Sequence, residues 1–248
     1  MEPIIIQQHE IFYELNRNNL IAYVINSPNA RGTIFFPPSI RYESQEYQIT
    51  SLKEGSFQNN KKIKSIEISD KSKFKTISKN ALSKSEIRNL FISSQVDQLE
   101  DGWCHCTDDL NSVIVSPSNK TFKYLDDTHQ IIIGKSDIKG DIFDTVIFAN
   151  RDIKHASIPK FIKYIKSYAF QNCKKLETIE IQKDSELVSI CDKAFSYTSI
   201  ENFFISPKVH NLNDSWCHAT SDLNSVTISP SNKNFGYLDE KHHNCWKK

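Results

Sequence analysis

Two stretches of this chain nearly repeat one another: FQNNKKIKSIEI at residues 57–68 and FQNCKKLETIEI at residues 170–181. The tripeptide WCH at 103–105 returns at 216–218, and LNSVIVSPSNK at 110–120 returns as LNSVTISPSNK at 223–233. Every pair is separated by 113 residues, so the copies align without a gap. An offset shared by three separate segments indicates an internal duplication of the chain.

Each copy contains a shorter period, built from an apolar residue, two free positions, a second apolar residue, one free position and a third apolar residue. The template starts at Ile63, Ile87, Leu110, Ile153, Leu176, Ile200 and Leu223, and in degenerate form at Arg31. From Ile63 on, the starts are 23 or 24 residues apart, except for one interval of 43. The last two apolar positions share one face of a strand, and the position between them faces the other way. Strands that return so regularly predict a solenoid with a continuous core.

The links between these strands carry a second apolar set, such as Ile77, Ala81 and Leu82. We expect them to line the far wall of the solenoid on short helical turns or irregular loops. The interval of 43 residues holds two β-rich runs, His129–Ile133 and Thr145–Ala149, around a turn that contains Gly134 and Gly140. This pattern predicts a β-hairpin inserted into the array.

The expected organisation is a single continuous domain. Residues 1–46 are rich in strand-forming segments and predict an N-terminal cap, because open arrays need covered ends. Residues 47–248 form the predicted right-handed, curved solenoid, with copy one at 47–159 and copy two at 160–248. The second copy stops inside a repeat, at HHNCWKK (242–248), without a recognisable polar cap.

The segment from Ile158 to Ile181, with Ala169-Phe170, Cys173, Leu176, Ile179 and Ile181 at fixed spacing, resembles the treponemal-type leucine-rich repeat of BspA-like proteins. The Tyr124–Gly134 element is similar to the interruptions of such arrays, and segments 27–30 and 44–51 resemble the versions found in parasitic protists. The resemblance covers nearly the whole chain and implies a leucine-rich-repeat solenoid. It also implies kinship with surface antigens and adhesins that bind proteins.

Charge and hydropathy limit the classes of partner that the sequence predicts. The formal net charge is +1, with 31 basic and 30 acidic residues, which gives no electrostatic reason to expect nucleic acid. The longest apolar runs, such as Ile131–Ile133, are far shorter than a membrane span, so we expect no membrane insertion. The start MEPIIIQQHE lacks a basic region and an apolar core, so the sequence predicts no secretory signal.

Metal-ligand residue types gather only in Trp103-Cys-His-Cys106, Trp216-Cys-His218, and His242, His243 and Cys245. Zinc sites usually have paired ligands at other spacings, and Cys106 becomes Ala219 in the duplicate. Adjacent strand residues point to opposite faces, so Cys104 and His105 are poorly placed to act as a nucleophile and its base. We therefore interpret the tryptophans and cysteines as recurring core residues, and expect no catalytic residue, no metal and no cofactor.

The free position between the last two core residues of each template should face solvent. This column reads Glu67, Phe91, Ile114, Ser157, Glu180, Phe204 and Thr227. Three of these are large and apolar where water is expected, and aromatic residues on a solenoid sheet are typical of a protein-binding surface. Glu67, Phe91, Ile114, Glu180, Phe204 and Thr227 are therefore the predicted binding residues. The alternative is that Phe91 and Phe204 pack against neighbouring side chains.

The sequence thus predicts a non-enzymatic protein–protein interaction module, similar to an adhesin or surface antigen, with a protein partner. One alternative is an intracellular scaffold that self-associates through its C-terminal end. A remote alternative is a metal-dependent enzyme at the Trp-Cys-His positions. Location stays open, because the missing signal favours the cytoplasm and the family resemblance favours the cell surface.

Overall fold

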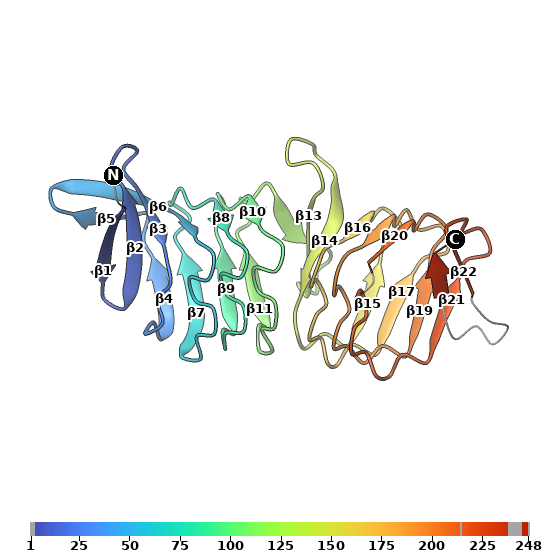
Figure 1. Cartoon of the computed structure of the whole chain (residues 1–248). Helices are drawn as coiled ribbons and strands as arrows, with labels where there is room; N and C mark the ends of the chain where they lie inside the picture. The colour runs from blue at the N-terminus through green and yellow to red at the C-terminus, as the bar shows by residue number, and fades with distance from the viewer. Residues whose placement is uncertain (1–2, 214, 238–244, 248) are drawn as a thin grey trace. The chain divides into compact units, whose positions relative to one another are not determined.

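The computed structural model describes residues 3–213, 215–237 and 245–247. The chain divides into two compact units, residues 1–123 and 124–248, each of which stacks parallel strands as rungs of a β-solenoid (Figure 1). Strand β12 (Phe122–Tyr124) lies at the boundary between the units. The division into a cap at residues 1–46 and a solenoid at 47–248, within one continuous domain, stays a prediction.

The first unit contains two sheets. Its strands are β1 (Ile4–Gln8), β2 (Ile11–Asn16), β3 (Ile21–Val24), β4 (Gly32–Phe36), β5 (Ser39–Tyr42), β6 (Gln45–Leu52), β7 (Ile63–Ile68), β8 (Thr76–Ile77), β9 (Asn89–Ile92), β10 (Gln98–Leu99) and β11 (Ser112–Val115). One sheet has the order β4-β7-β9-β11, with all neighbours parallel. The other has the order β1-β2-β3-β6-β8-β10, with β5 paired antiparallel to β6.

The second unit repeats this plan. Its strands are β13 (Ile131–Lys135), β14 (Phe143–Ala149), β15 (His155–Ile158), β16 (Tyr164–Ile165), β17 (Thr178–Ile181), β18 (Ser189–Ile190), β19 (Asn202–Ile205), β20 (Asn211–Leu212), β21 (Ser225–Ile228), β22 (Phe235–Tyr237) and β23 (Cys245–Lys247). β15 pairs with β17 and β19 with β21, all parallel. β13, β14, β16, β18 and β20 form a sheet in that order, and β22 pairs antiparallel with β23.

The two-residue spacing of the template sets which side chains form the core. In β7, Ile66 and Ile68 are buried whereas Glu67 between them is exposed. The same alternation places Leu90 and Ile92 of β9 inside. Because period-two alternation exposes one face and buries the other, the apolar face of every rung stacks on the next and forms the core of each unit.

The links between the sheets contain tight turns rather than short helical turns, and the described residues contain no helix. Non-glycine residues with positive φ interrupt them, for example Asn80 at 60° and Lys84 at 57°. In this link the amide of Ala81 bonds within the turn, to Ser78, while the amide of Leu82 bonds to the carbonyl of Trp103 in the next rung. Because alternate amides serve the neighbouring rung, an α-helical bonding pattern cannot form.

Candidate protein-binding face

Four side chains form one row across the sheet of β4, β7, β9 and β11. The strand register pairs Phe35 with Glu67, Glu67 with Phe91, and Phe91 with Ile114. All four point away from the core. Phe35 is 59% exposed and Ile114 51% exposed, while Phe91 is half-buried and Glu67 exposed. We call the outward surface of these four strands the open face.

A second row on the open face is polar. It consists of Thr33, Ser65, Asn89 and Ser112, which the register also places side by side. The structure shows no hydrogen bond from these four side chains to any other described residue. The open face therefore offers unused hydrogen-bonding groups beside an apolar row.

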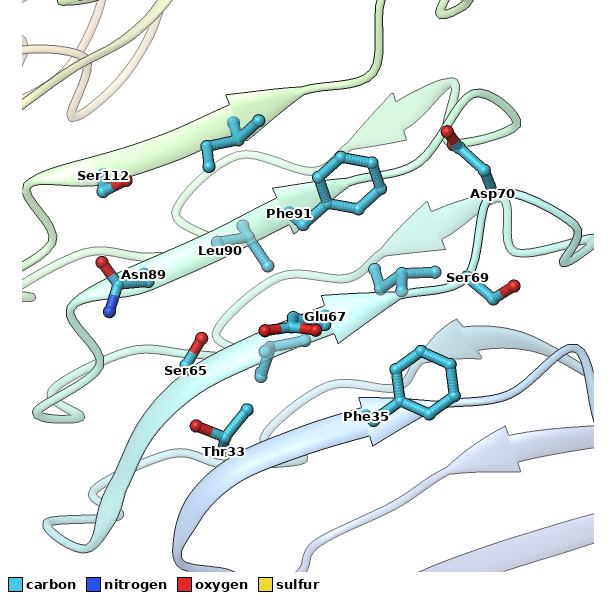
Figure 2. A pocket seen from close by; sticks show the side chains of 13 residues that line it. Thr33, Phe35, Ser65, Glu67, Ser69, Asp70, Asn89, Leu90, Phe91 and Ser112 are labelled. Carbon is cyan, nitrogen blue, oxygen red and sulfur yellow. The ribbon is translucent and has the colours of Figure 1, made fainter.

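The two rows line an open groove of about 750 Å³, shown in Figure 2. Glu67 and Asp70 are its acidic lining residues, and no lysine, arginine or histidine lines it. Asp70 is held in place at the rim: its carboxylate accepts the amide of Ser94 at 2.7 Å and the hydroxyl of Ser116 at 3.0 Å. The groove is thus both apolar and acidic.

Phe35 is absent from the predicted binding residues. The template at Arg31–Phe36 is degenerate and precedes Ile63 by 32 residues instead of 23 or 24. The hairpin of β5 and β6 occupies the extra length, so the period does not align Phe35 with Glu67. The alternation Ile34-Phe35-Phe36 within the degenerate template is the one sequence signal that places Phe35 outward.

The predicted binding residues of the second unit lie on the corresponding face of its own rungs. Glu180 pairs in register with Ser157, and Phe204 with Thr227. Glu180 and Thr227 are exposed, whereas Phe204 is half-buried and packs against the buried core of the unit. This face therefore presents less apolar surface than the open face of the first unit.

The polar positions also differ between the copies. Thr178, Asn202 and Ser225 occupy the positions that Ser65, Asn89 and Ser112 hold 113 residues earlier. In the second unit they are bonded within the sheet: Thr178 lies 2.7 Å from Nδ1 of His155, and Ser225 donates to Asn202 at 2.6 Å. The duplication thus keeps these polar residue types but leaves only the first copy with free groups.

The Trp-Cys-His positions belong largely to the core. Trp103 and Trp216 are 4% and 8% exposed, and Cys104 is buried. His105 is half-buried, with its Nδ1 2.6 Å from the hydroxyl of Ser83 in the previous rung. These side chains therefore stabilise the stacking of neighbouring rungs.

No group of three or more His, Cys, Asp or Glu side chains that could hold a metal occurs within residues 3–213 and 215–237. Of the predicted C-terminal cluster, His242 and His243 lie outside the described residues, and only the backbone of Cys245 is described, in β23. In the described part of the chain, no helix has the length and apolar character needed to cross a bilayer.

Parallel rungs, a buried apolar template and an exposed sheet surface define a leucine-rich-repeat solenoid. The model of the BspA-type leucine-rich repeat region matches six copies, over residues 35–125 and 141–239. The chain belongs to this family, and its resemblance to BspA-like proteins is confirmed.

Solved structures support the same fold. The chain is similar to the pneumococcal vaccine antigen PcpA, with 16% identity and a TM-score of 0.54 over 93% of this chain and 82% of that one. A leucine-rich-repeat protein from Eubacterium ventriosum has 13% identity and a TM-score of 0.51, over 92% of this chain and 73% of that one. At these identities the likeness concerns the fold alone. No curated protein sequence matches the chain.

Proposed function

We propose that the chain is a non-enzymatic interaction module, similar in kind to surface antigens and adhesins, that binds a protein partner on the exposed faces of its rungs. The single observation that carries this proposal is the row of Phe35, Phe91 and Ile114 around Glu67 on the open face. Phe35 and Ile114 are large apolar side chains that are more than half exposed, which is costly in water, and Phe91 adds a half-buried ring between Glu67 and Ile114. Exposed apolar and aromatic side chains of this kind are typical of protein interfaces.

Two further observations support a protein partner. The fold is that of a family with surface antigens among its structural neighbours, such as PcpA. The open face is an exposed sheet surface that carries an open groove, and repeat proteins commonly bind through such extended surfaces. Glu180, Phe204 and Thr227 are proposed as the corresponding contacts of the second unit.

The experiment compares protein capture by three forms of the chain. The immobilised protein is exposed to a panel of purified extracellular and cytosolic proteins, together with two variants. The open-face variant carries Phe35→Ser, Phe91→Ser and Ile114→Ser. The matched control carries Ile138→Ser and Ile142→Ser, two residues that are 59% and 63% exposed but lie in the link between β13 and β14.

We expect the native chain and the control to capture the same panel proteins, and the open-face variant to bind them more weakly by about tenfold or more. All three forms should give the same circular dichroism spectrum, because the substituted positions are exposed or half-buried. Capture that is equal for all three forms would contradict the proposal.

A further inference from the structure

Glu67 lies between two aromatic side chains. Phe35 precedes it in the register and Phe91 follows it, so the three occupy adjacent strands at the same level (Figure 2). Neighbouring strands are about 4.8 Å apart, which separates the two aromatic positions by roughly 10 Å. One extended alkyl chain fits between two rings at that separation. The arrangement is a slot with aromatic walls and a carboxylate at its floor.

The carboxylate of Glu67 is available to a partner. Glu67 is exposed and has neither a hydrogen bond nor an ion pair with any other residue that the structure describes. Lys64, on the same strand, is already paired with Glu86 at 2.8 Å. Asp70 adds a second negative charge, and the groove lining contains no basic residue. The groove is therefore electrostatically complementary to a positively charged group.

We propose that the groove of the open face selects an extended peptide segment through a lysine or arginine side chain. Its aliphatic stem lies between Phe35 and Phe91, and its charged end pairs with Glu67. A cation near an aromatic ring is attracted by the ring, and a long basic side chain buries its methylene groups against apolar surface. This inference rests on the proposed function and names the chemical class of the partner.

The polar row extends the same recognition. Ser65, Asn89 and Ser112 lie beside the slot, each two residues before Glu67, Phe91 or Ile114 on the same strand. Their side chains form no hydrogen bond to another described residue. An extended segment that crosses the strands brings its main-chain amides and carbonyls over these groups. Hydrogen bonds to the backbone of the segment form whatever its sequence, whereas the slot selects one basic side chain.

The second unit provides the matched control. Glu180 occupies the position of Glu67 one copy later, but its register partner on β15 is Ser157 rather than an aromatic residue. Thr178 and Asn202, the counterparts of Ser65 and Asn89, are bonded within the sheet. The carboxylate at Glu180 therefore lacks both the aromatic wall on the β15 side and the free polar row.

The test selects short random peptides, displayed on phage, against the full native chain. It then compares the binding of the selected peptides to Glu67→Gln, to Glu180→Gln and to the open-face variant. We expect peptides selected by the native chain to be enriched in lysine or arginine next to apolar residues. A synthetic peptide from this set, labelled with a fluorophore, should bind Glu67→Gln about two- to fivefold more weakly by anisotropy, and Glu180→Gln as tightly as the native chain. Replacing its basic residue by glutamine should cause a similar loss.

The outcomes separate this inference from the proposed function. Peptides that lose binding to the open-face variant but contain no enriched basic residue would overturn the slot and leave the protein-binding face intact. Selection of no peptide that depends on the open face would overturn both. Equal loss in Glu67→Gln and Glu180→Gln would show a general charge effect and would also overturn the slot.

Discussion

Asn60 joins two rungs by hydrogen bonds to four main-chain groups. Its Nδ2 donates to the carbonyls of Ser27 and Ala30 in the preceding rung, at 3.3 and 2.9 Å. Its Oδ1 accepts the amides of Lys62 and Ile63, at 2.8 and 2.9 Å, where β7 begins. Because Asn60 is buried, the carbonyl of Ala30 and the amide of Ile63 depend on it rather than on water, whereas the carbonyl of Ser27 also accepts the amide of Ala30.

The same device recurs along the chain. Asn119 and Asn232 each donate to two carbonyls of the preceding rung and accept two amides of their own segment. The position of Asn60 in the second copy is held by Cys173, whose thiol lies 3.5 Å from the carbonyl of Asn150. A thiol can donate to the preceding rung but is a weak acceptor, so the cysteine replaces only half of the function.

Asn60→Ala should lower the free energy of unfolding by about 2–4 kcal/mol, because it leaves the buried carbonyl of Ala30 and the amide of Ile63 without partners. Urea unfolding followed by circular dichroism measures the change. Asn18→Ala is the control, since the exposed side chain of Asn18 forms no hydrogen bond to another described residue, and it should change the free energy by less than about 0.5 kcal/mol. Similar losses in the two variants would contradict the role given to Asn60.

At the scale of the element, a column of aromatic rings connects the rungs of the second unit. Phe195 stacks on Phe170 with ring centroids 4.9 Å apart, and meets Phe203 edge-on at 5.3 Å. Phe203 in turn contacts Trp216 at 4.6 Å. The position of Phe195 in the first copy is held by Leu82, so the first copy has an aliphatic side chain where the second has an aromatic one.

Phe195→Ala should destabilise the protein by about 3–5 kcal/mol, because it removes a fully buried ring and leaves a cavity between three rungs. Phe161→Ala, at a residue that is 46% exposed in the same unit, should cost far less. Urea unfolding measures both, and hydrogen exchange should show faster opening of amides in β17, β19 and β21 for Phe195→Ala only. Unchanged exchange in these strands would refute the proposed column.

The sequence predicts the strands of the repeat template well, because burial imposes a fixed pattern on them. β7, β9, β11, β15, β17, β19 and β21 all lie within the predicted templates. The strands of the opposite sheet could not be predicted in this way, because β8 and β10 have two residues each and so show no alternation. The links form turns because residues such as Asn80 adopt positive φ, which no glycine signals in advance.

The candidate site is predictable only in part. Alternation places Glu67, Phe91 and Ile114 outward without any coordinates. It does not reveal that Phe35 completes their row, because the β5–β6 hairpin breaks the period. Nor does it reveal that Phe204 packs against the core, since that depends on the neighbouring rungs. The role of these residues in binding stays a prediction.

At the scale of the whole molecule, each unit buries a side chain that ionises at alkaline pH. Burial raises the pKa of the Cys173 thiol from 9.0 to about 11, an effect that the positive charge of Arg151 partly opposes. Burial also raises the pKa of the Tyr13 hydroxyl from 10.0 to about 12. In both cases the folded protein disfavours the charged form, which the unfolded chain adopts freely.

The free energy of unfolding should therefore be unaffected by Cys173 below its unfolded pKa of 9.0 and decrease as the pH rises to about 11. Tyr13 should act in the same way between 10.0 and about 12. Ionisation of each group lowers the free energy of unfolding by up to about 3 kcal/mol at the upper end of its pH range. Urea unfolding across this range should show a shallower alkaline loss for Cys173→Ala and for Tyr13→Phe. Profiles parallel to that of the native chain would contradict the prediction.

The sheet that begins with β1 has a consequence for how the protein is made. β1, β2 and β3 pair with their immediate neighbours, and β6, β8 and β10 then add in the order in which they occur in the chain. Domains begin to fold from the N-terminus during synthesis, and repeat arrays extend by adding units to a formed edge. As residues 3–123 emerge from the ribosome in sequence, β2 and each later strand of this order therefore pairs with a strand that was synthesised before it.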